Sequence, residues 1–203
     1  MPLAVRVVIA EDEAIVRLDL KETLEEEGYE VVGDTGRGDE AVALVREHRP
    51  DLAILDVKMP GVDGLTAARE ITGEHLSAVL ILTAFSQRNL IEEARDAGAM
   101  AYLVKPFQAS ELIPAIEVAL GRHAEMEALS AANQALEGEN QRMADALETR
   151  RMVDRAKGLL MDEHGMKEAD AFQFIQRTAM RERVLMKEIA RRVVEGEVRP
   201  GGA

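Results

Sequence analysis

The stretch Leu52–Gly64 reads LAILDVKMPGVDG, an apolar run that ends in one aspartate and is followed by a Pro-Gly turn. A carboxylate at the end of an apolar strand costs free energy unless a group outside that strand makes use of its charge. The role of Asp56 therefore depends on which residues end the other apolar runs of the chain.

Short apolar runs alternate with amphipathic segments through the first 104 residues. The spacing of apolar residues predicts helices over 13–28, 39–48, 65–72, 90–97 and 110–120. The apolar runs predict strands over 4–10, 30–33, 51–56, 78–83 and 101–104. Five apolar strands alternating with helices predict an α/β fold, a doubly wound parallel sheet covered on both faces. Sheets of this class bind ligands beyond the carboxyl ends of their strands.

Acidic residues end two of these strands. Glu11 and Asp12 follow the first strand and Asp56 ends the third, so three carboxylates are expected to converge at one sheet edge. Their mutual repulsion calls for a cation, and oxygen ligands of this kind suit Mg²⁺. Thr83 ends the fourth strand, and Lys105-Pro106 follows the fifth. A metal, a hydroxyl and a lysine around one aspartate predict phosphoryl transfer to a carboxylate nucleophile.

The composition excludes several classes of protein. The 203 residues include no cysteine, which excludes disulfides and thiol chemistry and fits an intracellular protein. No apolar run approaches the roughly 18–20 residues that a membrane span needs. The N-terminal sequence lacks a basic region and is not expected to be a secretory signal. We therefore expect a cytoplasmic protein with no membrane partner.

The net charge of −13 is unevenly distributed. Residues 150–203 hold 12 of the 25 basic and 9 of the 38 acidic residues, a balance of +3, which leaves −16 for residues 1–149. An acidic front and a mildly basic back predict two modules with different partners.

A heptad pattern lies between these modules, in a predicted helical linker over 122–149. Its apolar seam contains asparagine at two successive a positions, Asn133 and Asn140, an arrangement that often specifies a parallel dimer. The pattern leaves two possibilities open: self-association through the seam, or packing of the seam on its own chain. The seam residues are Met126, Leu129, Asn133, Leu136, Asn140, Met143 and Leu147.

The back module is predicted to be a small helical bundle over 150–196, with helices over 152–163, 168–180 and 184–194 and a disordered tail over 197–203. Its basic residues predict either a nucleic-acid surface or solvated faces, because a balance of +3 is a weak signal. Its predicted core residues are Phe172, Ile175, Ala179, Leu185 and Ile189.

The first module, over 1–121, resembles the receiver domain of two-component response regulators. The match spans about residues 5–120 and every strand end, which implies the flavodoxin-like strand order 2-1-3-4-5. The resemblance implies that Asp56 accepts the phosphoryl group and that Mg²⁺ is held by Glu11, Asp12, Asp56 and the backbone carbonyl of Lys58. It further implies that Thr83 and Tyr102 are switch residues and that Lys105, before a cis proline, contacts the phosphoryl group. The implied partner is a sensor histidine kinase. The implied protein is not a metabolic enzyme, although its receiver catalyses its own phosphoryl transfer and dephosphorylation.

The back module resembles the ANTAR domain, a three-helix RNA-binding module of transcription antiterminators. The resemblance rests on Ala156–Met161 (AKGLLM), Ala171-Phe172, Thr178–Met180 with Arg183, and Ile189-Ala190. It implies binding to paired stem-loops in nascent leader transcripts, with loop bases splayed out for recognition. A DNA-binding output and a purely protein-binding output are the alternatives. The basic residues expected to contact RNA are Arg151, Lys157, Arg177, Arg181, Arg183 and Lys187.

Overall fold

The computed structural model describes residues 4–84 and 88–200, without the side chains of residues 88 and 89. The described chain forms two compact units, residues 1–129 and 130–203, and the long helix α5 contributes to both. The elements of the first unit are β1 (Arg6–Ala10), α1 (Ala14–Glu26), β2 (Glu30–Thr35), α2 (Gly38–His48), β3 (Leu52–Asp56), α3 (Gly64–Gly73), β4 (Ala78–Thr83), α4 (Arg88–Asp96), β5 (Ala101–Val104) and the start of α5 (Ala109–His164).

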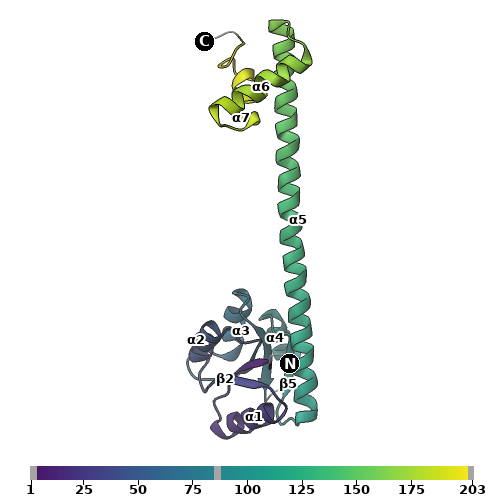
Figure 1. The fold of residues 1–203 in the computed structure, drawn as a ribbon. Helices are drawn as coiled ribbons and strands as arrows, with labels where there is room; N and C mark the ends of the chain where they lie inside the picture. Colours follow the sequence, from purple (N-terminus) through teal and green to yellow (C-terminus); the bar gives the residue numbers. More distant parts are fainter. Residues whose placement is uncertain (1–3, 85–87, 201–203) are drawn as a thin grey trace. The chain divides into compact units, whose positions relative to one another are not determined.

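The first unit is a five-stranded parallel sheet of order β2-β1-β3-β4-β5, as the resemblance implies. The central strand β3 is buried along its whole length, as expected for a strand covered on both faces. On one face its side chains Ala53 and Leu55 pack with buried residues of α2, α3 and α4. On the other face Leu52 and Ile54 pack with α1 and the first turns of α5. Figure 1 shows these helices on either side of the sheet.

The pairing register brings the carboxyl ends of the central strands together. Ala10 of β1 pairs with Leu55 of β3, so Glu11 follows beside Asp56. Asp56 pairs with Leu82 of β4, which places Thr83 one residue further along. Thr83 in turn pairs with Val104 of β5, and Lys105 comes next. Parallel pairing without a shift along these three ladders therefore gathers the predicted site residues at one edge.

The second unit is a helical bundle built from the end of α5, α6 (Glu168–Glu182) and α7 (Met186–Val194). The prediction of a separate helix over 152–163 is wrong, because these residues continue α5 to His164. The sequence offers no helix-breaking residue between them and the linker. Gly165, with a φ of 63°, follows the helix and allows the reversal into α6. The described residues contain no helix that is long and apolar enough to cross a membrane.

Two predicted core residues of the bundle are exposed. Ile175, Ala179 and Ile189 are buried as expected, but Phe172 is 40% exposed and Leu185 is 78% exposed. Helix α6 buries the face that carries Ala171 and Ile175, and Phe172 lies about 100° around the helix from Ala171. Leu185 is the residue before the first turn of α7, where no helical face directs it inward.

The chain after α7 differs from the prediction of a disordered tail over 197–203. The backbone N–H groups of Glu197 and Val198 both donate to the carbonyl of Arg192. Val198 also packs against the core of the bundle. Residues 201–203 lie outside the described part of the chain.

Candidate functional site

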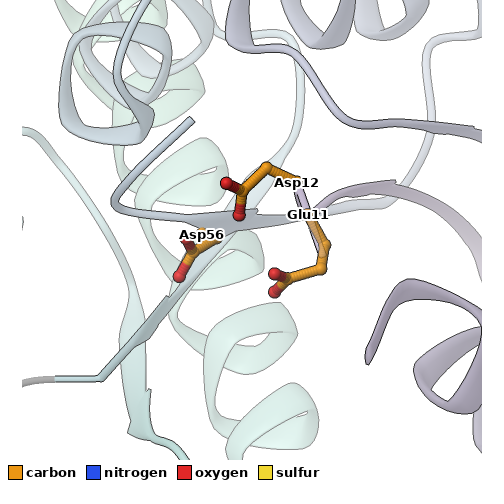
Figure 2. Close-up of side chains that lie close together, drawn as sticks. All are labelled: Glu11, Asp12 and Asp56. Atoms are coloured by element: carbon orange, nitrogen blue, oxygen red, sulfur yellow. The ribbon is translucent and has the colours of Figure 1, made fainter. Parts of the chain in front are cut away.

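Three carboxylates converge where β1 and β3 end. Glu11, Asp12 and Asp56 each offer a carboxylate oxygen, and these oxygens lie within 4.8 Å of one another (Figure 2). Glu11 is fully buried and Asp56 is nearly so, whereas Asp12 is exposed. The strands thus hold two of the acids in the protein and leave the third at the solvent edge.

Lys105 supplies the positive charge of the pocket. Its Nζ lies 3.0 Å from Oδ1 of Asp56 and also forms an ion pair with Glu11. The peptide bond to Pro106 is cis, as the resemblance implies. The backbone of Lys105 is fixed as well, because its N–H donates to the Thr83 carbonyl at 2.8 Å. One cation is therefore fixed between the two buried carboxylates.

Burial and pairing set the protonation of this pocket. Burial raises the pKa of the Glu11 carboxyl, although the hydrogen bond from Lys105 acts against this. Burial alone would lower the pKa of Lys105, but hydrogen bonds to Glu11 and Asp56 outweigh it and raise that pKa. The ammonium group consequently stays charged at neutral pH, beside Asp56.

The two Asp56 oxygens have different partners. Oδ1 faces Lys105, while Oδ2 accepts a hydrogen bond from the backbone N–H of Lys58 at 3.1 Å. Gly64, at the start of α3, allows the loop after β3 to return to this point, because a Cβ there would lie 1.9 Å from the carbonyl oxygen of Asp56. Asp56 is thus held by its own loop.

The donor set fits a hard divalent cation. The exposed carboxylate of Asp12 and the neighbouring Asp56 offer oxygens close enough to surround one ion, as Mg²⁺ prefers. Glu11 is a weaker candidate for direct ligation. Lys105 and the N–H of Glu13 already engage its two oxygens.

The predicted switch residues occupy different environments. Thr83 is buried at the end of β4, whereas Tyr102 of β5 is 43% exposed.

Arg17 is a residue of this site that the sequence did not indicate. Its Nη1 donates to the backbone carbonyl of Glu11 and its Nε donates to Asp34 at 3.3 Å. No sequence pattern marks such a contact, because its acceptor is a backbone atom of another element.

The six predicted RNA-contacting residues are not equivalent in the structure. Lys157 lies between Asp154 and Glu168, each 2.9 Å away, and its side chain is 17% exposed. Lys187 forms an ion pair with Glu148 at 2.5 Å. Arg177 and Arg181 line one cavity along α6. The remaining two, Arg151 on α5 and Arg183 after α6, are exposed.

A parallel sheet of order 2-1-3-4-5 with an acidic pocket and a lysine at its carboxyl edge defines a response-regulator receiver. Residues 7–117 match the response regulator receiver domain and residues 141–194 match the ANTAR domain, so the chain belongs to the response regulators that carry an ANTAR domain.

Individual relatives agree with this family. The transcriptional regulatory protein PdtaR of Mycobacterium tuberculosis (strain ATCC 25618 / H37Rv) is 57% identical over 190 residues, which are 94% of this chain and 89% of that protein. The chemotaxis protein CheY of Bacillus subtilis (strain 168) is 39% identical over 58% of this chain and 99% of its own length. Among solved structures, the signal receiver domain of NarL from Mycobacterium tuberculosis matches with a TM-score of 0.57 and 30% identity, over 59% of this chain and 98% of that chain.

Proposed function

We propose that the protein is a phosphorylation-controlled regulator that binds stem-loops of nascent leader RNA and promotes transcription antitermination. The observation that carries the proposal is the placement of Asp56 within 3.0 Å of Lys105 in an acidic pocket, in a chain that also contains an ANTAR domain. Both proposed partners, a sensor histidine kinase and a nascent transcript, act in the cytoplasm, so we place the protein there.

Asp56 is the proposed phosphoacceptor. One of its oxygens forms a bond to phosphorus while the bond from phosphorus to the kinase histidine breaks, and the imidazole leaves. Lys105 contacts the transferred phosphoryl group and offsets its charge, and the hydroxyl of Thr83 donates a hydrogen bond to a phosphoryl oxygen. Asp12, Asp56 and the backbone carbonyl of Lys58 are proposed to hold Mg²⁺ directly, and Glu11, whose two oxygens are already engaged, is proposed to add negative charge beside the ion. The ion would neutralise negative charge on the phosphoryl oxygens. The same pocket catalyses the later dephosphorylation, in which water attacks phosphorus, the bond to the Asp56 oxygen breaks and inorganic phosphate leaves.

Thr83 and Tyr102 are proposed to transmit the change. A phosphorylated aspartate carries additional charge and new hydrogen-bond acceptors, which draw the Thr83 hydroxyl toward Asp56. The space that Thr83 leaves admits the Tyr102 ring, which now stands 43% exposed on β5. The surface around β5 then differs between the two states of the receiver.

The linker seam is proposed to pair two copies of the chain. Leu129, Leu136 and Leu147 are each 58–64% exposed, which is the exposure that pairing through the seam requires. Within the second unit, Leu147 lies about 180° around α5 from Ala156, which faces the bundle core. A second copy can therefore meet the seam without displacing α6 or α7. Pairing on activation would present two ANTAR domains to two loops of one transcript.

The proposal is tested with an RNA that carries two hexanucleotide-loop hairpins. The protein is titrated with this RNA, with and without a small-molecule phosphodonor and Mg²⁺, beside the variant Asp56→Asn. We expect phosphorylation to increase RNA affinity in the original protein and to leave the variant unchanged. A chelator added before the phosphodonor should abolish the increase.

Other outcomes separate the alternatives. If the phosphorylated protein binds duplex DNA and does not bind the hairpins, the result favours a DNA-binding function over the proposed RNA-binding function. Phosphorylated protein with no nucleic-acid affinity would favour a protein-binding output. Absence of any phosphorylation at Asp56 would overturn the receiver chemistry itself.

A further inference from the structure

Two cavities in the second unit share one aromatic ring. The first has a volume of about 580 Å³ along the outer flank of α6, and the second has a volume of about 500 Å³ between the end of α6 and the chain after α7. Phe174 and Arg181 line both. Phe174 is partly buried and packs against the core of the bundle, and it also lines both cavities. The two cavities are hereafter called the Phe174 groove.

The Phe174 groove carries an excess of guanidinium groups. Its acids are Asp170, Glu182 and Glu197. Arg192 pairs with Glu182 at 2.6 Å and with Glu197 at 3.6 Å, and Arg181 also lies 3.6 Å from Glu182, so the charges of these two arginines and two acids cancel. Arg177, by contrast, contacts the amide of Gln173 at 3.4 Å. The arginines of the groove are Arg177, Arg181, Arg192 and Arg199.

Gln173 adds a group suited to the edge of a base. Its amide can both donate and accept hydrogen bonds, and it lines the same cavity as Phe174 and Arg177. An aromatic ring, exposed guanidinium groups and a side-chain amide are the groups on which proteins stack and recognise unpaired RNA bases.

The other aromatic residue of α6 has different surroundings. Phe172 is 40% exposed, but its helical neighbours three and four residues away are Glu168, Ala169, Ile175 and Gln176, none of them basic. Phe174 has Arg177 three residues away on the same flank. Within one turn along α6, Phe174 therefore has a basic residue, Arg177, as well as the acidic Asp170, whereas Phe172 has no basic residue.

We infer that the Phe174 groove receives unstacked loop bases of the RNA, with one base stacked on the Phe174 ring and the adjacent phosphates held by Arg177 and Arg181. This inference rests on the proposed RNA-binding function and assigns its contact surface. Of the six residues predicted to contact RNA, Arg177 and Arg181 line the groove, whereas Lys157 and Lys187 lie outside it and form ion pairs elsewhere.

The chain contains no tryptophan, which allows a direct optical test. Phe174→Trp and the matched control Phe172→Trp each introduce one fluorophore into the full-length protein, at two positions of the same helix. Both are titrated with the two-hairpin RNA after phosphorylation. We expect strong quenching for F174W, because a stacked base quenches indole, and little change for F172W. Quenching confined to F172W would overturn the assignment.

A second measurement uses affinity. Phe174→Leu keeps an apolar side chain against the core, so its thermal unfolding should match that of the original protein, while its RNA affinity should fall about tenfold. An abasic nucleotide at the stacked loop position should weaken binding of the original protein by a similar factor and F174L hardly at all. Equal losses in both proteins at all six loop positions would contradict stacking on Phe174.

The arginines are tested with a control from the same bundle. Arg177→Ala and Arg181→Ala should each weaken RNA binding severalfold. Each should also make the slope of log binding constant against log salt concentration smaller in magnitude by about one. Arg191→Ala, which removes an arginine paired with Glu188 and Glu195 on α7, should do neither. If the original protein binds the hairpins and all three arginine variants bind alike, the Phe174 groove is not the RNA contact surface, while the proposed RNA-binding function stands. If the original protein does not bind the hairpins, both the assignment of the groove and the proposed RNA-binding function are wrong.

Discussion

The backbone position of Asp56 depends on the absence of a side chain at Gly64. The backbone at Gly64 approaches the Asp56 carbonyl so closely that a Cβ would lie 1.9 Å from the oxygen and 2.8 Å from the carbon. Both atoms belong to the backbone, which cannot rotate away as a flexible side chain can. The loop after β3, including the Lys58 N–H that holds Oδ2 of Asp56, would have to shift.

We therefore predict that Gly64→Ala destabilises the protein by roughly 1–3 kcal/mol and slows phosphorylation at Asp56. Chemical denaturation and incorporation of phosphate from a small-molecule donor measure the two effects. Gly138→Ala is the matched control, because a Cβ there meets no atom within 4 Å. It should stabilise α5 by up to about 1 kcal/mol. Unchanged phosphorylation kinetics in G64A would show that the loop yields without cost to the site.

Asp63 caps the helix that follows this loop. Its carboxylate accepts hydrogen bonds from the backbone N–H of Thr66 at 2.9 Å and from the Thr66 hydroxyl at 2.8 Å. Partial burial alone would raise the pKa of Asp63, but these hydrogen bonds outweigh it and lower that pKa. A lowered folded-state pKa means that the stabilisation is present above the unfolded-state pKa and is lost as pH falls through the folded-state value.

We predict that Asp63→Ala costs about 1 kcal/mol of unfolding free energy at pH 7. The difference from the original protein should shrink below about pH 4, where the carboxylate takes up a proton. Urea denaturation at several pH values measures it. Asp63→Asn retains a capping side chain without the charge, so it should cost less than D63A at pH 7. A D63A penalty that is constant down to pH 3 would contradict an ionic cap.

Among the secondary-structure elements, the strands of the sheet and the edge at which they end are predicted well from the sequence. A short, continuously apolar run can be buried in only one way, as an inner strand covered on both faces. The runs that end at Asp56 and Thr83 are continuously apolar, so the polar residues that end them can lie only at the edge of the sheet. The core of the α6–α7 bundle is harder to predict. The periodicity of an amphipathic helix shows which side is apolar, but it does not show which residues at the margin of that side are buried. Phe172 lies beside the buried face of α6 and Leu185 precedes the first turn of α7, and both are exposed.

The seam of α5 remains a prediction at this scale. Its polar positions Asn133 and Asn140 reduce stability but favour one register and two strands. We predict that Leu136→Asp weakens association of the phosphorylated protein about 100-fold or more, because two leucine side chains leave the interface. Asn140→Leu should strengthen association and broaden the range of oligomers. Sedimentation equilibrium measures both.

The control for L136D adds the same charge off the seam. Gln134→Asp lies on the same helix, outside the heptad positions that form the seam, and should associate like the original protein. Equal association of L136D and Q134D would show that the copies do not meet through α5. Loss of association in both would point to charge repulsion between helices as the cause.

At the scale of the whole molecule, the two units differ in charge. Residues 130–203 contain 13 basic and 13 acidic residues, so the entire net charge of −13 resides in residues 1–129. An RNA bound by the second unit is therefore held by a chain whose whole net negative charge belongs to the receiver. Each unit has its own buried core, which makes a fragment of residues 130–203 a reasonable object for comparison.

We predict that this fragment binds the two-hairpin RNA severalfold more tightly than the unphosphorylated full chain at about 0.05 M salt. The advantage should largely vanish near 0.3 M, where the screening length falls below about 6 Å. Fluorescence anisotropy of labelled RNA across that range measures it, and circular dichroism confirms that the fragment is helical. The isolated receiver, added separately at equal concentration, should not restore the weaker binding, because repulsion acts only on the tethered unit. An advantage that persists unchanged at high salt would instead indicate that the receiver blocks the RNA surface by direct contact, and phosphorylation would then act by releasing that contact.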